Sequence, residues 1–503
     1  MGVEERGRVK MKTRDMRELR AKQEKSRANR QLLIPEVLVT LLWVYMVLRW
    51  MYYPSTLIVL VYLWGLVWIA VKRPRWLPVV LLVTIPLEVS KEFIPAYSLP
   101  ERVAGYNVSI LDFFRLAQVA ITLRWLSDLW QRRNYVTEKI SVWRRVKKDS
   151  LLWLPILLLG VYLLSTVFSV SPAHSLNATL RLVTLLVTFY FAVAYVRDEK
   201  DLQRLGYTLI VLGSILGLMA IYEYFTAHFF FSATPAVVIN RRANATFADP
   251  NILGRFLVVT FLFSVAELER RIAWKERLLP LLAIFLQGAG LGITGSRGAI
   301  LALGVSAIIF VALIPRRKVT LSALVLMVLA IIAAAVLNPV IMARFESLRT
   351  GLLNASGGIR EYLWRSGIAM VRDHPIIGVG VGTFSFAFIK MYPYFNPYST
   401  FYVSLSHTAV LTTLAETGFI GFTVLYFLFA KTIQRGWDIF RTVSNERLRF
   451  LSASTVAGII AIFVSAQGEG RLYEEPLLWI LWAMLIAVSQ VPNMKPGKDI
   501  EKL

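Results

Sequence analysis

The sequence contains no cysteine among its 503 residues, and this absence excludes several kinds of chemistry. Disulfide bonds, thiolate zinc sites, iron–sulfur clusters and cysteine nucleophiles all require that residue. Histidine is scarce, with four residues, and the 32 acidic residues are outnumbered by 56 basic ones. Functional residues must therefore be sought among other side chains, and the basic ones are the most informative.

The sequence also lacks a recognisable signal peptide, an internal repeat and a Gly/Ser-rich linker. A signal peptide has an apolar core close behind its basic start, whereas residues 1–31 are polar and strongly basic and no apolar segment precedes Leu32. We therefore predict a basic cytoplasmic tail over residues 1–31, one transmembrane domain over residues 32–491, and a cytoplasmic C-terminal tail over residues 492–503.

Long apolar segments make up most of the chain. Hydrophobic residues account for 56% of it, and the mean hydropathy is +0.57, far above that of a soluble globular protein. Apolar segments lie at residues 32–48, 56–71, 76–89, 108–123, 151–169, 178–196, 205–225, 251–265, 278–294, 298–314, 320–338, 407–430, 450–466 and 476–491. The predicted fold is all-α, a polytopic membrane helical bundle of about 14 (12 to 14) transmembrane helices.

The formal net charge of +24 indicates topology rather than nucleic-acid binding. Lys and Arg residues gather in short segments between apolar ones, at residues 72–75, 132–148, 197–200, 270–277, 316–318 and 431–449. With fourteen spans, all of these segments fall on one side of the membrane, and basic residues are held on the cytoplasmic side. We therefore expect both termini in the cytoplasm, contact with membrane lipids, and no nucleic-acid partner.

The same topology places residues 339–406 in one long extracytoplasmic loop. Within it, Ile359, Leu363 and Met370 share a helical face opposite charged residues, which predicts an amphipathic helix lying in the membrane interface. Three glycines follow at residues 378–382 without the spacing of a nucleotide-binding loop. We interpret them as a flexible segment in which backbones approach closely.

Three segments place basic side chains at the outer ends of predicted spans. Arg241 and Arg242 precede the span that starts at residue 251, Arg297 precedes the span at residues 298–314, and His407 begins the span at residues 407–430. Each position lies beside a helix N-terminus, where unpaired N–H groups and a partial positive charge favour a phosphate. Arginine adds a planar fork of donors that binds two phosphate oxygens at once. These features predict a diphosphate site at the outer surface.

Cap-type residues support this placement of helix starts. Asp249 and Pro250 form a typical N-cap and first-turn pair, and Ser296 and Ser406 stand just ahead of two other spans.

The alternative interpretations are structural. An arginine near a helix end often reaches to lipid headgroups, and a lone histidine at a helix start is more often hydrogen-bonded than catalytic. Arg255, inside a span, is costly unless it faces a wet or anionic cavity, and Arg115 and Arg181 have equal claims to structural pairing. The acidic residues of the outer face show no spacing that predicts a metal site.

Four motifs in the second half of the chain resemble those of the O-antigen ligase and O-antigen polymerase superfamily. They are Arg242-Ala-Asn-Ala-Thr-Phe-Ala-Asp-Pro-Asn251, Ser296-Arg297-Gly298, Arg360 with the segment from Trp364 through Asp373-His374-Pro375 to Phe384, and His407 through Glu416-Thr-Gly-Phe-Ile-Gly421. The family's glycine near position 245 is Ala245 in this chain, and Thr408 stands where asparagine often follows the histidine.

The resemblance implies a membrane glycosyltransferase that needs no metal or other cofactor, with a helical fold similar to that of the GT-C-like polyprenyl-sugar enzymes. Arg242 and Arg297 would hold the diphosphate of an undecaprenyl-diphosphate-linked glycan donor and stabilise it as it leaves. His407 would act as the general base on the acceptor hydroxyl, and attack opposite the diphosphate would invert the anomeric centre. Arg241, Arg255 and Arg360 are expected to bind the diphosphate or another part of the substrate.

The predicted function is thus transfer of a glycan to a lipid or glycan acceptor at the outer face of the cytoplasmic (inner) membrane, as in an O-antigen ligase. A polymerase that joins lipid-linked repeat units and a protein O-glycosylating transferase remain alternatives, because they differ only in the acceptor. A flippase for lipid-linked sugars is another, although flippases usually show repeated halves and polar groups near the midplane. A scaffolding protein would leave the outer arginines and histidine unexplained.

Overall fold

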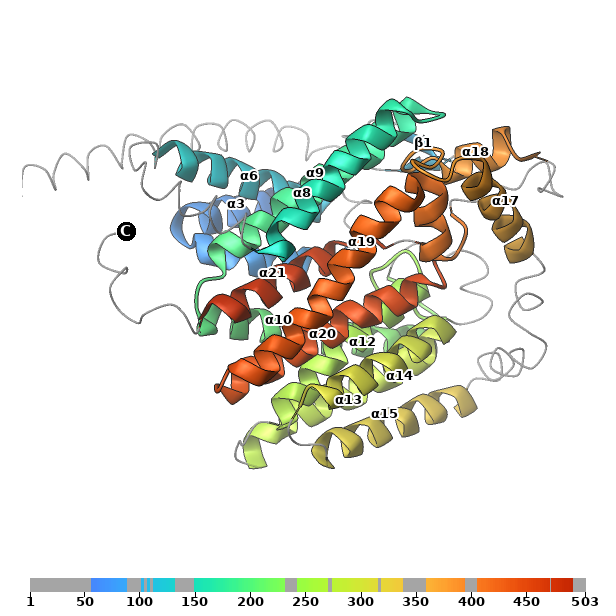
Figure 1. Cartoon of the computed structure of the whole chain (residues 1–503). Helices are drawn as coiled ribbons and strands as arrows, with labels where there is room; N and C mark the ends of the chain where they lie inside the picture. The colour runs from blue at the N-terminus through green and yellow to red at the C-terminus, as the bar shows by residue number, and fades with distance from the viewer. Residues whose placement is uncertain are drawn as a thin grey trace, which may run out of the picture.

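The structure is a computed structural model, and it describes residues 56–87, 101–103, 106–108, 112–131, 149–230, 242–269, 274–314, 318–337, 359–393, 405–470 and 472–491. The apolar segment predicted at residues 32–48, both terminal tails and Arg241 lie outside these residues. Figure 1 shows that the described chain is built almost entirely of helices.

Helices account for nearly every predicted apolar segment. They are α3 (Thr56–Lys72), the 3₁₀ helix η1 (Pro74–Trp76), α4 (Leu77–Thr84), α6 (Phe113–Gln131), α8 (Ser150–Val167), α9 (Pro172–Tyr195), α10 (Glu199–Thr226), α12 (Pro250–Glu269), α13 (Trp274–Thr294), α14 (Arg297–Ala312), α15 (Lys318–Leu337), α17 (Ile359–Asp373), α18 (Phe384–Lys390), α19 (Ala409–Thr442), α20 (Glu446–Ala466) and α21 (Pro476–Gln490). The all-α class is therefore confirmed in outline for the described residues.

One departure concerns residues 101–131. Strands β1 (Glu101–Val103) and β2 (Tyr106–Val108) form a short antiparallel pair, so the segment predicted as a span at residues 108–123 starts in a strand. The helix itself begins at Phe113 and continues to Gln131. Asp112 accounts for the later start, because its carboxylate accepts the Arg115 N–H at 2.8 Å and so acts as a cap.

Side-chain caps and first-turn prolines also define other helix starts. Asp149 accepts the N–H of Leu151 ahead of α8, and Asp198 accepts the N–H of Asp201 in α10. Pro250 opens α12, and Asp249 accepts the Asn251 N–H at 2.6 Å, so the cap predicted there is confirmed.

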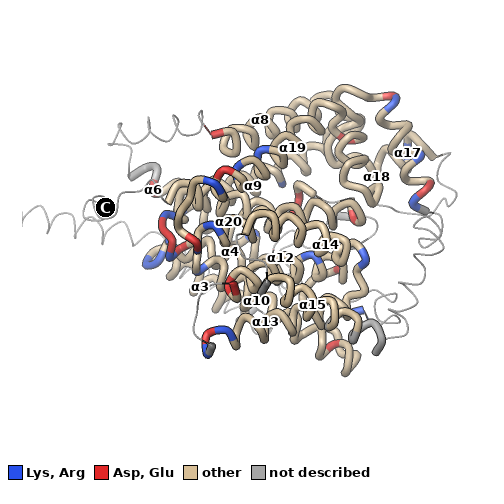
Figure 2. The backbone as a smooth tube through the Cα atoms, turned by 60° about the horizontal axis from the view of Figure 1, so that its bottom comes forward, with Lys and Arg blue, Asp and Glu red and all other residues tan. Residues whose placement is uncertain are grey.

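The helices are those of a polytopic membrane protein. Among the described residues, seven helices (α8, α9, α10, α12, α13, α19 and α20) are long and apolar enough to cross a membrane, and shorter apolar stretches lie in α3, α4, α14, α15 and α21. Figure 2 shows Lys, Arg, Asp and Glu mostly at the ends of these helices, with long uncharged stretches between them. Such segregation suits a hydrocarbon core, which disfavours charge.

Helices α12, α20 and α21 form the centre of the bundle. Nearly every residue of α12 and α21 is buried, and these helices pack among α9, α10, α13, α14 and α19. Outer helices instead leave large apolar side chains exposed, such as Trp64 in α3, Ile308 in α14 and Val325 in α15. In water such a surface would be costly, whereas in lipid it is the expected exterior.

A smaller cluster of elements covers one end of the bundle, where α17 and α18 lie beside the start of α19 (Figure 1). The amphipathic helix predicted in the loop is present as α17, and Leu363 and Met370 of its apolar face are fully buried. This face packs against protein rather than lipid, because it joins Phe384 of α18 and Ala415 of α19 in one apolar cluster.

The segment at residues 378–382 is a place of close backbone approach, as its glycines predicted. At Gly378 φ is +78°, and a Cβ there would lie 2.4 Å from the carbonyl carbon of Glu416. The partner is a break in α19 at Gly418, with φ +62°. Because the break frees carbonyls of the helix, Val379 N–H can donate to Ala415 O at 2.9 Å.

Candidate functional site

The turn at residues 467–470, directly after α20, contacts two of the predicted arginines. Arg255 of α12 forms an ion pair with Glu469, with Nη1 and Oε2 3.0 Å apart. Arg360 of α17 donates from Nη2 to the carbonyl oxygen of Gly468 at 3.5 Å. Side chains more than one hundred residues apart in the sequence thus meet at one turn.

His407 lies beside the same turn. A Cβ built on Gly470, where φ is +85°, would lie 3.2 Å from the backbone nitrogen of His407. Two residues into α19, the N–H of Val410 donates to Oε1 of Gln467 at 3.2 Å. The backbone of His407 has φ +57°, which lies in the left-handed region that residues other than glycine rarely adopt.

The start of α19 differs from the prediction. His407 was expected to begin the helix with Ser406 as a cap, but Thr408 is the N-cap residue and Ala409 the first helical residue. The Ser406 hydroxyl instead accepts the Thr408 N–H at 3.2 Å and shares a hydrogen bond with the Thr412 hydroxyl at 2.8 Å. These bonds fix the loop that carries His407, so the imidazole lies ahead of the helix rather than on it.

Arg242 is anchored next to the turn between α13 and α14. Its side chain is largely buried, with the residue 8% exposed, and Nε donates to the carbonyl oxygen of Thr294 at 2.8 Å. Nη2 donates to Oδ1 of Asn251 at 3.0 Å. Thr294 ends α13, three residues before Arg297, so two arginines that are 55 positions apart in sequence lie around one helix junction.

Arg297 opens α14, and Ser296 caps that helix as predicted, because its hydroxyl accepts the Ala299 N–H at 3.3 Å. The helix start packs against the end of α20, since a Cβ on Gly298 would lie 3.8 Å from Ser465 O. Burial, and next the positive charge of Arg297, lower the pKa of Arg360 from its ordinary value. The structure therefore draws two like charges close together, an arrangement typical of a site for an anion.

Residues 282–426 match the family model of the O-antigen ligases. The matched segment runs from α13 into α19 and contains Arg297, Arg360 and His407, while Arg242 and Arg255 precede it. The resemblance predicted from the motifs is thereby confirmed over this segment. Among curated proteins, none matches the chain.

Arg255 precedes the matched segment by 27 residues and is almost fully buried, with the residue 2% exposed. It forms ion pairs with both Glu469 and Glu475. The condition set by the sequence, that an arginine here must face a wet or anionic environment, is met by these carboxylates and by a cleft.

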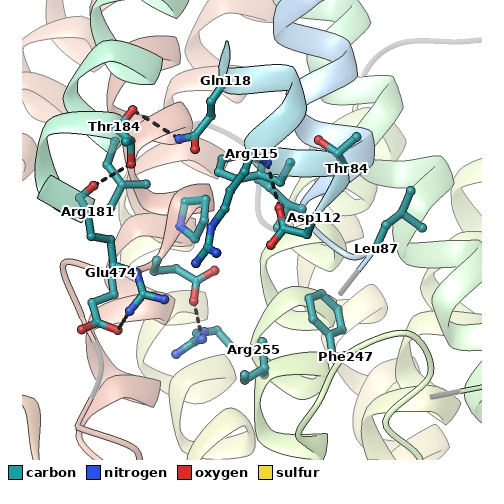
Figure 3. Close-up of a pocket in the computed structure, with 16 residues that line it drawn as sticks. Thr84, Leu87, Asp112, Arg115, Gln118, Arg181, Thr184, Phe247, Arg255 and Glu474 are labelled. Carbon is teal, nitrogen blue, oxygen red and sulfur yellow. Dashed lines mark hydrogen bonds and ion pairs between the residues drawn. The ribbon is translucent and has the colours of Figure 1, made fainter. Parts of the chain in front are cut away.

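The cleft lies between α4, α6, α9, α12 and the loop before α21 (Figure 3). It has a volume of about 890 Å³ including its open mouth, and its lining is Thr84, Ile85, Leu87, Asp112, Phe114, Arg115, Gln118, Arg181, Thr184, Leu185, Phe247, Ile252, Arg255, Glu474, Glu475 and Pro476. Arg115 and Arg255 reach into it from different helices (Figure 3). Arg181 forms an ion pair with Glu474 at 2.7 Å, which supports the structural alternative for that residue.

The cleft joins charged, amide and hydroxyl groups to apolar walls. Guanidinium and carboxylate groups stand beside the amide of Gln118, while Phe114 and Phe247 supply flat apolar surface. Such a mixture can hydrogen-bond hydroxyl groups and pack against the C–H face of a sugar ring. Among the residues that the structure describes, no group of three His, Asp or Glu side chains is placed to bind a metal.

Sequence reasoning missed Glu223, at the end of α10. Its side chain is buried, with the residue 1% exposed, and it accepts the backbone N–H groups of Phe230, Asn244 and Ala245. Two of these belong to the segment that carries Arg242. The available signal was a single carboxylate near the C-terminal end of the apolar segment at residues 205–225, where a charged group is expensive unless it is hydrogen-bonded.

Proposed function

We propose that the protein is a glycosyltransferase of the O-antigen ligase type, which moves a glycan from undecaprenyl diphosphate to an acceptor hydroxyl. The observation that carries this proposal is the convergence of Arg360 and His407 on the turn at residues 467–470, with Arg297 at the adjoining start of α14 and Arg242 at the same helix junction. An anion bound between the guanidinium groups would lie close to an imidazole, as transfer from a diphosphate requires.

In the proposed reaction, the acceptor oxygen forms a bond to the anomeric carbon of the donor sugar as the bond from that carbon to the diphosphate oxygen breaks. His407 takes the acceptor proton, and the diphosphate leaves with the bonding electron pair on its oxygen. Arg297, Arg360 and Arg242 stabilise the charge that develops there. Attack from the side opposite the leaving group inverts the anomeric centre, and the arginines supply the positive charge without a metal.

The roles of the remaining predicted residues follow from their surroundings. Because Glu469 and Glu475 balance the charge of Arg255, we assign Arg255 to the wall of the cleft and place a sugar, rather than the diphosphate, beside it. Arg241 precedes Arg242 in sequence, and its assignment to the diphosphate stays a prediction. The proposal includes a site on the periplasmic side of the inner membrane, cytoplasmic termini and a GT-C-like bundle of 12 to 14 spans.

Transfer by the purified protein tests the proposal directly. The full chain in lipid nanodiscs is incubated with labelled undecaprenyl-diphosphate oligosaccharide and a panel of acceptors, with and without EDTA. Products are identified by mass, and their anomeric configuration is determined by NMR. We expect a glycan–acceptor conjugate of inverted configuration whose yield EDTA does not change. In liposomes, movement of the donor to the opposite leaflet without formation of any conjugate would favour a flippase instead. Loss of product with EDTA would contradict the arginine-based mechanism.

The panel also separates ligase from polymerase. A ligase joins the glycan to a different lipid-linked or protein acceptor, whereas a polymerase extends a second copy of the lipid-linked donor. Products that grow by one repeat unit with donor alone would identify the polymerase.

A further inference from the structure

The buried carboxylate of Glu223 lies outside the set of groups used in the proposed reaction. It stands four residues before the left-handed residue Ala227 that ends α10. Oε1 accepts the N–H of Phe230 at 2.9 Å, and Oε2 accepts the N–H groups of Asn244 and Ala245 at 3.0 and 2.8 Å. One side chain therefore ties the end of α10 to the segment that leads into α12.

The segment that Glu223 holds is a tight turn. The N–H of Phe247 donates to Asn244 O at 3.0 Å, and the Asn244 amide donates back to Phe247 O at 2.6 Å. Ala245 within it has φ +48°, a conformation that costs free energy for any residue with a Cβ. Hydrogen bonds from the turn to the rest of the protein can offset this cost, and the two that Oε2 of Glu223 accepts are of that kind.

Arg242 lies two residues before the start of this turn. Its guanidinium reaches Thr294 and Asn251 only if the backbone at residues 242–244 stays where it is, since Nε and Nη2 must meet two fixed oxygens at once. A shift of about 1 Å in a group that stabilises a transition state lowers a rate by about two orders of magnitude. The position of the turn is thus a condition for the role proposed for Arg242.

We propose that Glu223 is a positioning residue for the transfer reaction, acting through the turn at residues 244–247 on Arg242. This inference rests on the proposed function. A carboxylate suits the task because both of its oxygens accept hydrogen bonds, whereas glutamine has one accepting oxygen and would point an N–H₂ group at a backbone N–H. Glu223→Gln thus keeps the volume of the side chain but removes one of its two hydrogen-bond-accepting oxygens.

Glu269, at the other end of α12, provides a matched control. It is also buried, with the residue 4% exposed, and it accepts the backbone N–H of Thr320 at 2.6 Å together with that residue's hydroxyl. Glu269→Gln therefore removes the same kind of bond far from Arg242. A purely structural role for Glu223 predicts similar behaviour of the two variants.

The absence of native cysteine allows the turn to be followed separately from activity. Thr246 is 7% exposed, and cysteine is close to it in volume, so Thr246→Cys introduces one buried thiol into the turn. Its reaction rate with a water-soluble maleimide, measured on the full chain in nanodiscs, reports how often the turn opens.

In the Thr246→Cys background we expect Glu223→Gln to raise the labelling rate about tenfold. In the otherwise native chain the same change should lower kcat for glycan transfer about 100-fold, with a smaller change in the donor KM. Glu223→Asp, which keeps both oxygens on a shorter arm, should recover part of the lost kcat. Glu269→Gln should change neither the labelling rate nor kcat by more than about twofold.

A fall in kcat with no change in labelling would overturn the inference, because Glu223 would then not act through the turn. Faster labelling with unchanged kcat would overturn it as well, since the position of Arg242 would not matter to the reaction. Wild-type protein that transfers no glycan to any acceptor would instead reject the proposed function, so the two failures are distinguishable.

Discussion

The two ends of α20 both gather arginines, but the partners of those arginines differ. At the start of α20, Arg447 pairs with Glu199 at 3.1 Å, and nearby Arg435 grips both oxygens of Asp149 at 2.7 and 3.1 Å. Beyond its other end, Arg360 donates to a backbone carbonyl and lies near a second positive charge.

The difference separates arginines whose charge is balanced within the protein from Arg360, whose hydrogen-bond partner is a neutral oxygen. A guanidinium bound by a carboxylate has its charge balanced within the protein, and the pair positions two helices. A guanidinium that donates to a neutral oxygen has no counter-charge from that partner, so its positive charge can attract an incoming anion. Arg255 stands between the two cases, because it lies close to the candidate site and is nevertheless paired with carboxylates.

The largest expected effect concerns the residues closest to the proposed reaction. Replacing His407 or Arg297 with alanine should lower glycan transfer by about three orders of magnitude or more, since each change removes a proton acceptor or a charge used in the transition state. Transfer is measured with purified protein and lipid-linked donor, and size-exclusion profiles check folding. Transfer within about threefold of wild type by either folded variant would exclude that residue from the reaction.

Two arginines on α17 provide the next comparison. Arg360 contacts the turn at residues 467–470, whereas Arg365 is exposed and pairs with Glu361 at 2.5 Å one turn away. Arg360→Ala should reduce kcat/KM for the donor about 100-fold, while Arg365→Ala should leave it nearly unchanged. Equal losses in the two variants would mean that α17 acts through its fold alone.

At the paired end, substitution should affect stability instead of catalysis. Asp149→Asn weakens a bidentate ion pair in which both side chains are mostly buried, and the expected destabilisation is about 1–2 kcal/mol. Thermal unfolding in detergent measures it, and transfer per folded molecule should stay at the wild-type level. A loss of transfer larger than the loss of folded protein would break the contrast between the two ends of α20.

Much of this contrast could be predicted from the sequence. Apolar segments indicate where helices form, and the grouping of Lys and Arg between them shows which basic residues are unusual, so Arg242, Arg297 and His407 stand out by that pattern alone. Local signals such as Ser296 also sufficed, because a cap acts within one turn of helix.

The partners could not be predicted, since they depend on packing between distant segments. Nothing near Arg255 in sequence indicates Glu469 or Glu475, which lie more than two hundred positions away. The α19 start was misplaced because Ser406 bonds to Thr412 and holds a loop where a cap was expected. Likewise the pattern of α17 predicts an apolar face but not whether lipid or protein covers it.

The smallest expected effect is at Ala245, where glycine stands in the resembling family. Ala245 adopts φ +48°, and a Cβ in that region costs about 1–2 kcal/mol. Ala245→Gly removes this strain but gives the unfolded chain more freedom, which lowers the free energy of unfolding by about 0.4–1 kcal/mol. The change also removes a fully buried methyl group, which costs about 0.8 kcal/mol. We therefore expect little net change in stability, seen as an almost unchanged Tm, with transfer unchanged because Glu223 still holds the turn. A marked fall in transfer would show that Ala245 helps to place Arg242, and that the candidate site depends on local stiffness as well as on long-range bonds.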